Sequence, residues 1–275
     1  MSAPRELHDL VETWPAPDLT GLAVTSPSDT LGAAGDTTRV SRIASISKIC
    51  AALAAMVAVE EGTIALGDRA GPPGTTVRHL LAHAAGYAFD GPDPIAAVGS
   101  RRIYSNTGIE VFADHLARAA GMPFEQYQRE AVFQPLGMVD TRLEGSPAFG
   151  VHSNVDDLVL LARELLAPTL VTTETLAHAV SPQFPDLAGV IPGFGRHDPN
   201  PWGLGIEIRG DKAPHWTAPG NSPLTFGHFG GTGTYLWVDP DRQLAAVAIS
   251  GVDFDAWAVE IWPQTNQAIL DRFTG

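Results

Sequence analysis

Several features are scarce or missing in this chain of 275 residues. Its single cysteine is Cys50, so no disulfide can form within the chain. Its longest strongly apolar run, residues 49–59, is too short for a membrane helix, which needs about 20 residues. The first 19 residues lack the basic, apolar and small-residue regions of a secretory signal. These absences predict a cytoplasmic protein that does not cross a membrane.

Positive charge is also in short supply. The chain has 17 Lys and Arg residues against 31 Asp and Glu residues, which gives a net charge of −14. Such a chain repels phosphate backbones and anionic lipid, so neither nucleic acid nor a membrane surface is expected as a partner. With 44% hydrophobic and 17% charged residues, the composition is that of a globular enzyme. A small-molecule substrate is the expected partner, and the oligomeric state stays open.

The order of the predicted elements indicates one domain of the α+β class over residues 1–275. Short strands broken by Gly and Pro are predicted near the start of the chain, and strands return near its end. We expect these strands to pair as an antiparallel sheet flanked by N-terminal and C-terminal helices. Residues 71–189 carry helical segments and no alternating pattern. They predict a mostly helical lobe inserted into an α/β body made of residues 1–70 and 190–275.

Three segments carry finer predictions. A helix is expected from Ser47 to Glu61, because good helix formers there place apolar side chains 3.6 residues apart and Gly62 follows as a stop. A last helix is expected from Phe254 to Arg272. Residues 181–201, rich in Pro and Gly, are expected to form a loop.

Ser45 and Lys48 lie three positions apart where the first long helix begins. With two lysines and 13 serines in the chain, random placement would give about 0.1 such pairs. Residues i and i+3 share a helix face, so the amine can reach the hydroxyl, and burial lowers the pKa of a lysine toward that of a useful base. The plain alternative is that Ser45 caps the helix while Lys48 extends to solvent. On this segment alone, the two interpretations are equally good.

Two other stretches favour the catalytic interpretation. Tyr104 and Asn106 form a Y-x-N pattern at the start of a predicted helix. His228 and Gly230 form an H-x-G pattern on a predicted strand.

These three patterns together resemble the S-x-x-K, Y-x-N and K/H-x-G motifs of the serine β-lactamase and penicillin-binding protein superfamily, in the same order along the chain. The branch that the chain resembles holds class C β-lactamases, D-Ala-D-Ala peptidases and related esterases. The likeness covers roughly residues 20–270, because the flanking segments TVRHLLAHAAGY, QPLGM and GHFGGTGTYLWVDP also resemble that family.

The resemblance implies a β-lactamase-like fold and an acyl-serine mechanism that needs neither metal nor cofactor. Ser45 would be the nucleophile, and Lys48 with Tyr104 would move its proton. The backbone amides of Ser45 and Gly231 would form the oxyanion hole. The candidate substrate-binding residues are Asn106, His228, Gly230 and Gly231.

The expected activity is hydrolysis of an ester or amide through an acyl-Ser45 intermediate, with an esterase as the first choice. The alternatives are a β-lactamase or D-Ala-D-Ala carboxypeptidase, and a non-catalytic relative that only binds a ligand. His228 occupies a position where many β-lactamases have lysine, which weakens the case for a substrate carboxylate. Only 55 residues separate Lys48 from Tyr104, fewer than the family pattern leads us to expect. This short spacing predicts trimmed loops and a shallow, open pocket.

Two further patterns invite functional interpretations. His79 and His83 have the i, i+4 spacing of a metal-binding helix, but no acidic residue lies between them as in HExxH, so no metal site is expected. The glycine-rich GHFGGTG opens into a strand rather than a helix, so nucleotide binding is not expected.

Overall fold

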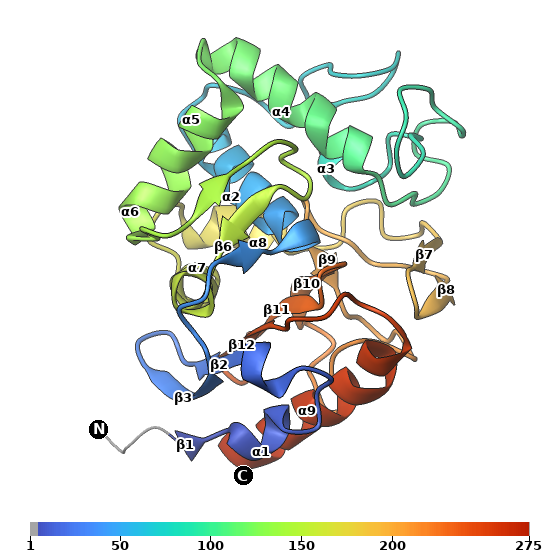
Figure 1. Cartoon of the computed structure of the whole chain (residues 1–275). Helices are drawn as coiled ribbons and strands as arrows, with labels where there is room; N and C mark the ends of the chain where they lie inside the picture. Colours follow the sequence, from blue (N-terminus) through green and yellow to red (C-terminus); the bar gives the residue numbers. More distant parts are fainter. Residues whose placement is uncertain (1–4, 275) are drawn as a thin grey trace.

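The computed structural model describes residues 5–274, and its centre is an antiparallel sheet built from both ends of the chain (Figure 1). Within the described residues this sheet has seven strands in the order β1-β3-β2-β12-β11-β10-β9. Strand β2 pairs with β12, with Leu22 opposite Ala248, so the two ends of the chain are joined directly. Only β1, which runs parallel to β3, departs from the antiparallel pattern. The strands are β1 (Arg5–Glu6), β2 (Gly21–Thr25), β3 (Thr30–Gly35), β9 (Glu207–Ile208), β10 (Phe226–Gly230), β11 (Thr234–Asp239) and β12 (Leu244–Ile249).

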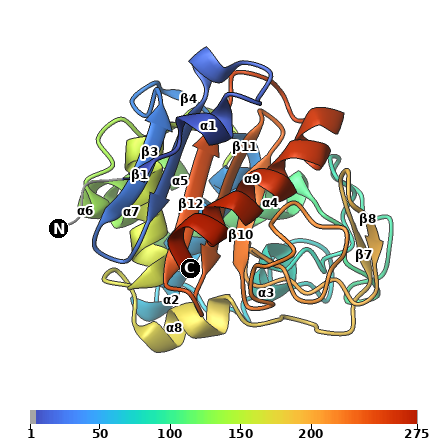
Figure 2. The ribbon, with the colours of Figure 1, turned by 90° about the horizontal axis from the view of Figure 1, so that it is seen from below.

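Alternate side chains of a strand point to opposite sides of the sheet. Here both sides are covered by helices, so both faces of the sheet are buried. On β11, Tyr235 and Trp237 pack toward the short helix α1 (His8–Val11) and the C-terminal helix α9 (Ala256–Thr274). Leu236 and Val238 pack on the other side, in the core that holds α2 (Ser47–Glu60) and α7 (Val155–Leu166). Figure 2 shows α9 crossing the strands on the first of these faces.

The helices of the middle segment lie on the α2 side of the sheet, at the top of Figure 1. They are α3 (Val77–Leu81), α4 (Asn106–Ala120), α5 (Phe124–Gln128), a π-helical turn η3 (Arg129–Phe133), α6 (Gln134–Leu136) and α8 (Thr173–Ala179). Two 3-10 turns, η1 (Pro17–Leu19) and η2 (Ala44–Ile46), complete the helical elements of the described residues.

Helix α2 occupies the centre of the molecule. It ends one residue earlier than predicted, and Gly62 follows with a positive φ of 76°, which favours glycine. Most of its side chains are buried, because it packs against the sheet on one side and against helical segments on the other. The last helix is confirmed with a shift of two residues at each end.

The predicted α+β class with its antiparallel sheet and flanking helices is confirmed, but three segments differ from expectation. The middle segment is not purely helical, since β5 (Arg142–Leu143) and β6 (Val151–Ser153) form a small sheet with β4 (Ser41–Arg42). One of the short strands near the start of the chain, β4, therefore pairs with this small sheet and not with the large one. Residues predicted as a loop contain a hairpin, β7 (Gly189–Ile191) and β8 (Gly195–His197).

The physical reason for these three differences is strand length. Strands of two or three residues are too short to show alternation in a sequence. The division into two lobes stays a prediction. Residues 5–274 contain no helix that is both long and apolar enough to cross a bilayer. The cytoplasmic location also stays a prediction.

Candidate active site

Ser45 lies on the 3-10 turn η2, which runs directly into the first turn of α2. Its side chain is half-buried and lies between two buried residues, Ala44 and Ile46. Strand β10 passes close beside this turn: a Cβ atom on Gly230 would lie 2.5 Å from the carbonyl oxygen of Ile43. A glycine at position 230 is therefore what allows β10 to approach the serine.

Lys48 is one turn farther along and is fully buried. Its Nζ lies 3.3 Å from Ser45 Oγ, 2.8 Å from Asn106 Oδ1 and 2.9 Å from the carbonyl oxygen of Ala148. Burial lowers the pKa of Lys48 to about 7, although the carboxylates of Asp90 and Glu110 favour its charged form.

The neutral form of this amine has a defined orientation. A neutral amine carries two N–H groups, and the two carbonyl-type oxygens of Asn106 and Ala148 can accept both. The remaining lone pair of Lys48 then faces Ser45 Oγ. The arrangement can therefore remove the hydroxyl proton. The alternative, in which Ser45 caps the helix and Lys48 extends to solvent, is excluded because Lys48 is fully buried.

Asn106 is the first residue of α4, and its amide group is fixed at both ends. The Oδ1 atom accepts from Lys48, and Nδ2 donates to Asp90 Oδ1 over 3.1 Å. Its backbone N–H donates to the carbonyl oxygen of Phe89 over 2.8 Å. Asp90 was not a candidate from the sequence, because an aspartate in a Gly- and Pro-rich loop carries no signal of its own.

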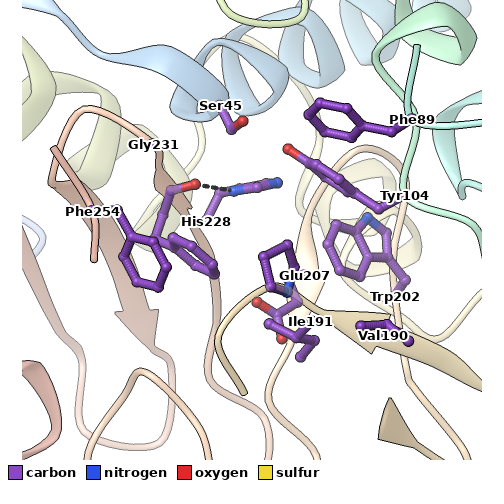
Figure 3. Close-up of a pocket in the computed structure, with 12 residues that line it drawn as sticks. Ser45, Phe89, Tyr104, Val190, Ile191, Trp202, Glu207, His228, Gly231 and Phe254 are labelled. Atoms are coloured by element: carbon purple, nitrogen blue, oxygen red, sulfur yellow. Dashed lines mark hydrogen bonds between the residues drawn. The ribbon is translucent and has the colours of Figure 1, made fainter. Parts of the chain in front are cut away.

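Tyr104 lies just before helix α4 and close to Lys48 on helix α2. Lys48 Nζ is 4.6 Å from the centre of the Tyr104 ring, and Figure 3 shows the hydroxyl directed toward the space between Ser45 and His228. Burial raises the pKa of Tyr104 well above its ordinary value, partly opposed by the Ser45 hydroxyl. The phenol is thus protonated at neutral pH and can give a proton.

His228 lies on β10 and is buried. Its Nδ1–H donates to the carbonyl oxygen of Phe229 over 2.6 Å, so Nε2 carries the lone pair of the neutral ring (Figure 3). Burial lowers the pKa of His228 to about 3, and the positive charge of Lys48 adds to the effect. The third motif therefore presents a neutral ring where a lysine would present a cation.

Ser45, Tyr104 and His228 line a pocket of about 160 Å³, whereas Lys48, Asn106 and Gly230 lie behind them and are not among its lining residues. Gly231 follows β10 and lines the pocket beside Ser45, and its carbonyl oxygen accepts from the Phe254 amide over 2.9 Å. Of the described residues that line it, none is a lysine or arginine, and most are apolar. The apolar and aromatic lining residues are Phe89, Val190, Ile191, Pro192, Trp202, Phe229 and Phe254.

A family model described as Beta-lactamase matches residues 30–261. The chain belongs to the Beta-lactamase family. A crystal structure of a β-lactamase from Mycobacterium bovis is 47% identical, has a TM-score of 0.95, and is matched over 97% of this chain and 99% of that one. The sequence-based prediction of a serine hydrolase of this family is confirmed.

Two more distant proteins are also similar to this chain. The D-alanyl-D-alanine-carboxypeptidase/endopeptidase AmpH of Escherichia coli is 29% identical over 145 residues, which span 39% of this chain and 38% of that protein. A hydrolase with promiscuous acyltransferase activity shares the fold with a TM-score of 0.78 and 18% identity, over 96% of this chain and 98% of that one.

The walls of this family member's pocket come from segments without motifs. Phe89 belongs to the loop before the second motif, Val190 to strand β7, and Phe254 to the start of the last helical region. Trp202 is buried and also forms part of the pocket wall. No local pattern marks these side chains, because only the folded chain brings them to Ser45.

Beneath the pocket lies a buried charged cluster that sequence reasoning missed. Glu207 accepts from Lys212 Nζ over 2.7 Å, from His215 Nε2 over 2.8 Å and from Trp216 Nε1 over 2.6 Å. Burial opposes ionisation of Glu207, but its interactions with Lys212 and His215 together outweigh that effect and hold the pKa below its ordinary value. Lys212, the second lysine of the chain, is thus paired with Glu207 in the interior and is not available to a substrate.

The histidine pair does not lie on one helix face. Helix α3 ends at Leu81, and His83 has a positive φ of 55° that turns it away from the helix. The His79 ring stacks on Phe184, whereas His83 packs against Tyr104. The expectation from their i, i+4 spacing, that His79 and His83 share one helix face, is therefore wrong, because α3 ends before it reaches His83.

Proposed function

We propose that the protein is an esterase that forms an acyl-Ser45 intermediate. The observation that carries this proposal is the buried Lys48 Nζ, which lies 3.3 Å from Ser45 Oγ and is held by the oxygen atoms of Asn106 and Ala148. Ser45 Oγ bonds to the ester carbonyl carbon while its proton passes to Lys48. Water later cleaves the acyl-enzyme and restores the serine.

The other site residues have complementary roles. Tyr104 supplies a proton to the departing alkoxide and regains one from protonated Lys48, which lies 4.6 Å from the centre of its ring. The backbone amides of Ser45 and Gly231 stabilise the oxyanion at the start of α2, where the helix dipole adds to the effect. Asn106 holds Lys48 in place and, with His228 and Gly230, borders the substrate.

The preference for esters is supported by the charge of the pocket. A neutral His228 and an apolar lining offer no cation to a carboxylate next to the scissile bond. A β-lactam or a D-Ala-D-Ala peptide carries such a carboxylate, whereas a simple ester does not.

A β-lactamase or D-Ala-D-Ala carboxypeptidase is the second candidate. It is favoured by the similarity to the Mycobacterium bovis β-lactamase and, over part of the chain, to the Escherichia coli carboxypeptidase. A small-molecule substrate is common to both candidates.

Intact mass after incubation with a fluorophosphonate tests the nucleophile. We expect one adduct, lost in Ser45→Ala. Ser47→Ala is the matched control, because the Ser47 hydroxyl bonds to backbone at Ala44 and Val151 and should keep the adduct. An adduct that survives in Ser45→Ala, or no adduct on the folded protein, would support the non-catalytic relative or a different nucleophile.

Substrate choice is tested on the same sample. We expect kcat/KM for a short-chain p-nitrophenyl ester to exceed that for a chromogenic cephalosporin by at least about tenfold. A cephalosporin that reacts faster than the ester would establish the second candidate instead.

A further inference from the structure

A second, larger cavity adjoins the pocket of Ser45. It has a volume of about 540 Å³ and shares four lining residues with the inner pocket, Phe89, Tyr104, Val190 and Pro192. In Figure 3, Phe89 and Tyr104 stand on the side of the pocket opposite Phe254. A substrate seated at Ser45 can therefore extend past Tyr104 into the outer cavity.

The charge of this outer cavity is opposite to that of the whole chain. Acidic residues outnumber basic ones by 31 to 17 in the sequence. The described residues that line the outer cavity nevertheless include three arginines and no acidic residue. They are Arg101, Arg102 and Arg196.

Two of the three arginines are available to a ligand. Arg102 is buried and donates to backbone carbonyl oxygens of Ala82, Gln183 and Asn200, so most of its N–H donors are already occupied. Among the described residues, the exposed Arg101 has no ion-pair partner. Arg196 is paired at 3.0 Å with Asp198, but both side chains are more than 60% exposed, and such pairs exchange partners at little cost.

Apolar side chains lie beside these charges. Phe89, Ile95 and Val190 line the outer cavity and are 52%, 58% and 57% exposed. Large apolar side chains exposed together next to a catalytic group are typical of a binding surface. The outer cavity thus combines an apolar wall with a cationic rim.

We propose that the outer cavity binds the leaving group of the substrate and that this group ends in an anion, a carboxylate or a phosphate, separated from the ester oxygen by an apolar spacer. The proposal rests on the proposed esterase function. The leaving group belongs on this side because Tyr104, which gives its proton to the departing oxygen, lines both cavities. The acyl group then occupies the apolar inner pocket, where His228 offers no cation.

The test compares aryl butyrates that differ only at the meta position of the leaving group. One carries a carboxylate, one a phosphate ester, and the third a carboxamide, which is neutral and similar in shape to the carboxylate. Rates are divided by the uncatalysed hydrolysis rate of each ester. We expect kcat/KM to favour at least one anionic ester, and this preference to fall about fivefold or more in Arg101→Gln/Arg196→Gln at low salt.

Two controls separate a local site from the general charge of the protein. Arg118→Gln removes an exposed positive charge at the far end of α4, about 18 Å along the helix from Asn106, and should leave the preference unchanged. Arg101→Lys/Arg196→Lys keeps both charges and should retain most of it. High salt should weaken the preference in the wild-type protein, because the rim is exposed.

Binding measured without turnover distinguishes this proposal from the esterase function. Calorimetry on Ser45→Ala gives the Kd of each intact ester, and we expect the anionic esters to bind more tightly unless both arginines are replaced. The anionic ester that loses its advantage over the carboxamide ester when both arginines are replaced identifies the anion. Equal preference in wild type and Arg101→Gln/Arg196→Gln, in both kinetics and binding, would overturn the outer-cavity proposal while fluorophosphonate labelling of Ser45 still upheld the proposed function.

Discussion

Lys48 is the residue whose surroundings matter most at the smallest scale. Burial pushes its pKa down to about 7, and two carboxylates, Asp90 and Glu110, oppose that shift. The neighbouring imidazoles of His83 and His228 are held neutral by burial, so they add no positive charge at neutral pH. The balance leaves an amine that loses its proton near neutral pH, which is what a general base requires.

Replacing Asp90 should move the pH dependence of the reaction. Only neutral Lys48 can accept the Ser45 proton, so kcat/KM should rise with pH through a midpoint of about 7. Asp90→Asn removes a charge that favours protonated Lys48, so its pKa falls and the rising limb moves to lower pH. Measuring kcat/KM for an ester from pH 5 to 9 in both proteins checks the direction.

Glu110→Gln serves as the matched variant for Asp90→Asn. It removes the other carboxylate, which bonds to Ser146 and not to Asn106, so it should shift the pH midpoint in the same direction without lowering the rate at high pH. Asp90→Asn should also lower that limiting rate, because Asn106 loses the charged acceptor that fixes its amide. A limb that stays in place, or moves to higher pH, would show that Asp90 does not act on Lys48.

At the scale of single elements, the start of helix α4 sets the second motif. Ser105 is its N-cap, and its hydroxyl accepts from the Gly108 amide over 3.1 Å. His83 holds the same segment, because its Nδ1 accepts from the Ser105 amide over 3.2 Å and its carbonyl oxygen accepts from the Ile103 amide over 2.9 Å. Tyr104 is thus fixed by bonds on both of its neighbours.

Removing the cap should affect both stability and catalysis. Ser105→Ala is expected to lower the free energy of unfolding by about 1 kcal/mol, the usual cost of an N-cap, and to lower kcat severalfold because Tyr104 and Asn106 flank the cap. Thr172→Ala removes the N-cap of α8, away from the pocket, and should cost a similar stability with unchanged kcat. Urea unfolding and ester kinetics measure both. Equal kcat values in the two variants would mean that the cap does not position the motif.

The elements also show where sequence patterns work. Helices α2 and α4 were predictable because each has a long run of helix formers that ends at a glycine, Gly62 or Gly121. The two- and three-residue strands were not, since nothing in such a short stretch distinguishes a strand from a loop. The pairing of β4 also depends on a partner more than 100 positions away, with Ser41 opposite Ser153.

At the scale of the whole molecule, the buried cluster around Glu207 joins strand β9 to residues 212–216. Lys212 also bonds to Asn200 Oδ1 over 2.9 Å, and the His215 pKa is lowered by burial, so one negative and one positive charge are enclosed together. Removing one member of such a pair leaves the other charge buried without compensation.

Glu207→Gln should therefore be strongly destabilising, by about 3–5 kcal/mol in the free energy of unfolding. Adding Lys212→Met removes the uncompensated charge, so the double variant should recover about half of the loss or more. Urea unfolding of the two single variants and the double variant gives the coupling between the two residues. Losses that simply add would show that the pair is not coupled.

The sequence by itself determined the candidate catalytic side chains and the fold class. Ser45 and Lys48 meet because i and i+3 share one turn of helix, which is a local property that a short pattern can reveal. Asn106 reaches Lys48 across 58 positions, yet the order of the three motifs was enough to name it. The antiparallel sheet followed from strands at both ends of the chain.

Only the tertiary structure decided what surrounds those side chains. Asp90, Glu207, the aromatic walls and the arginines of the outer cavity come from loops and short strands that carry no periodic signal. The charge state of Lys48 and the neutral form of His228 likewise depend on burial, which is a property of the packed chain and not of any one segment. The candidate catalytic residues could therefore be recognised from local spacing. Their surroundings, which set the pKa values, form only when distant segments are brought together.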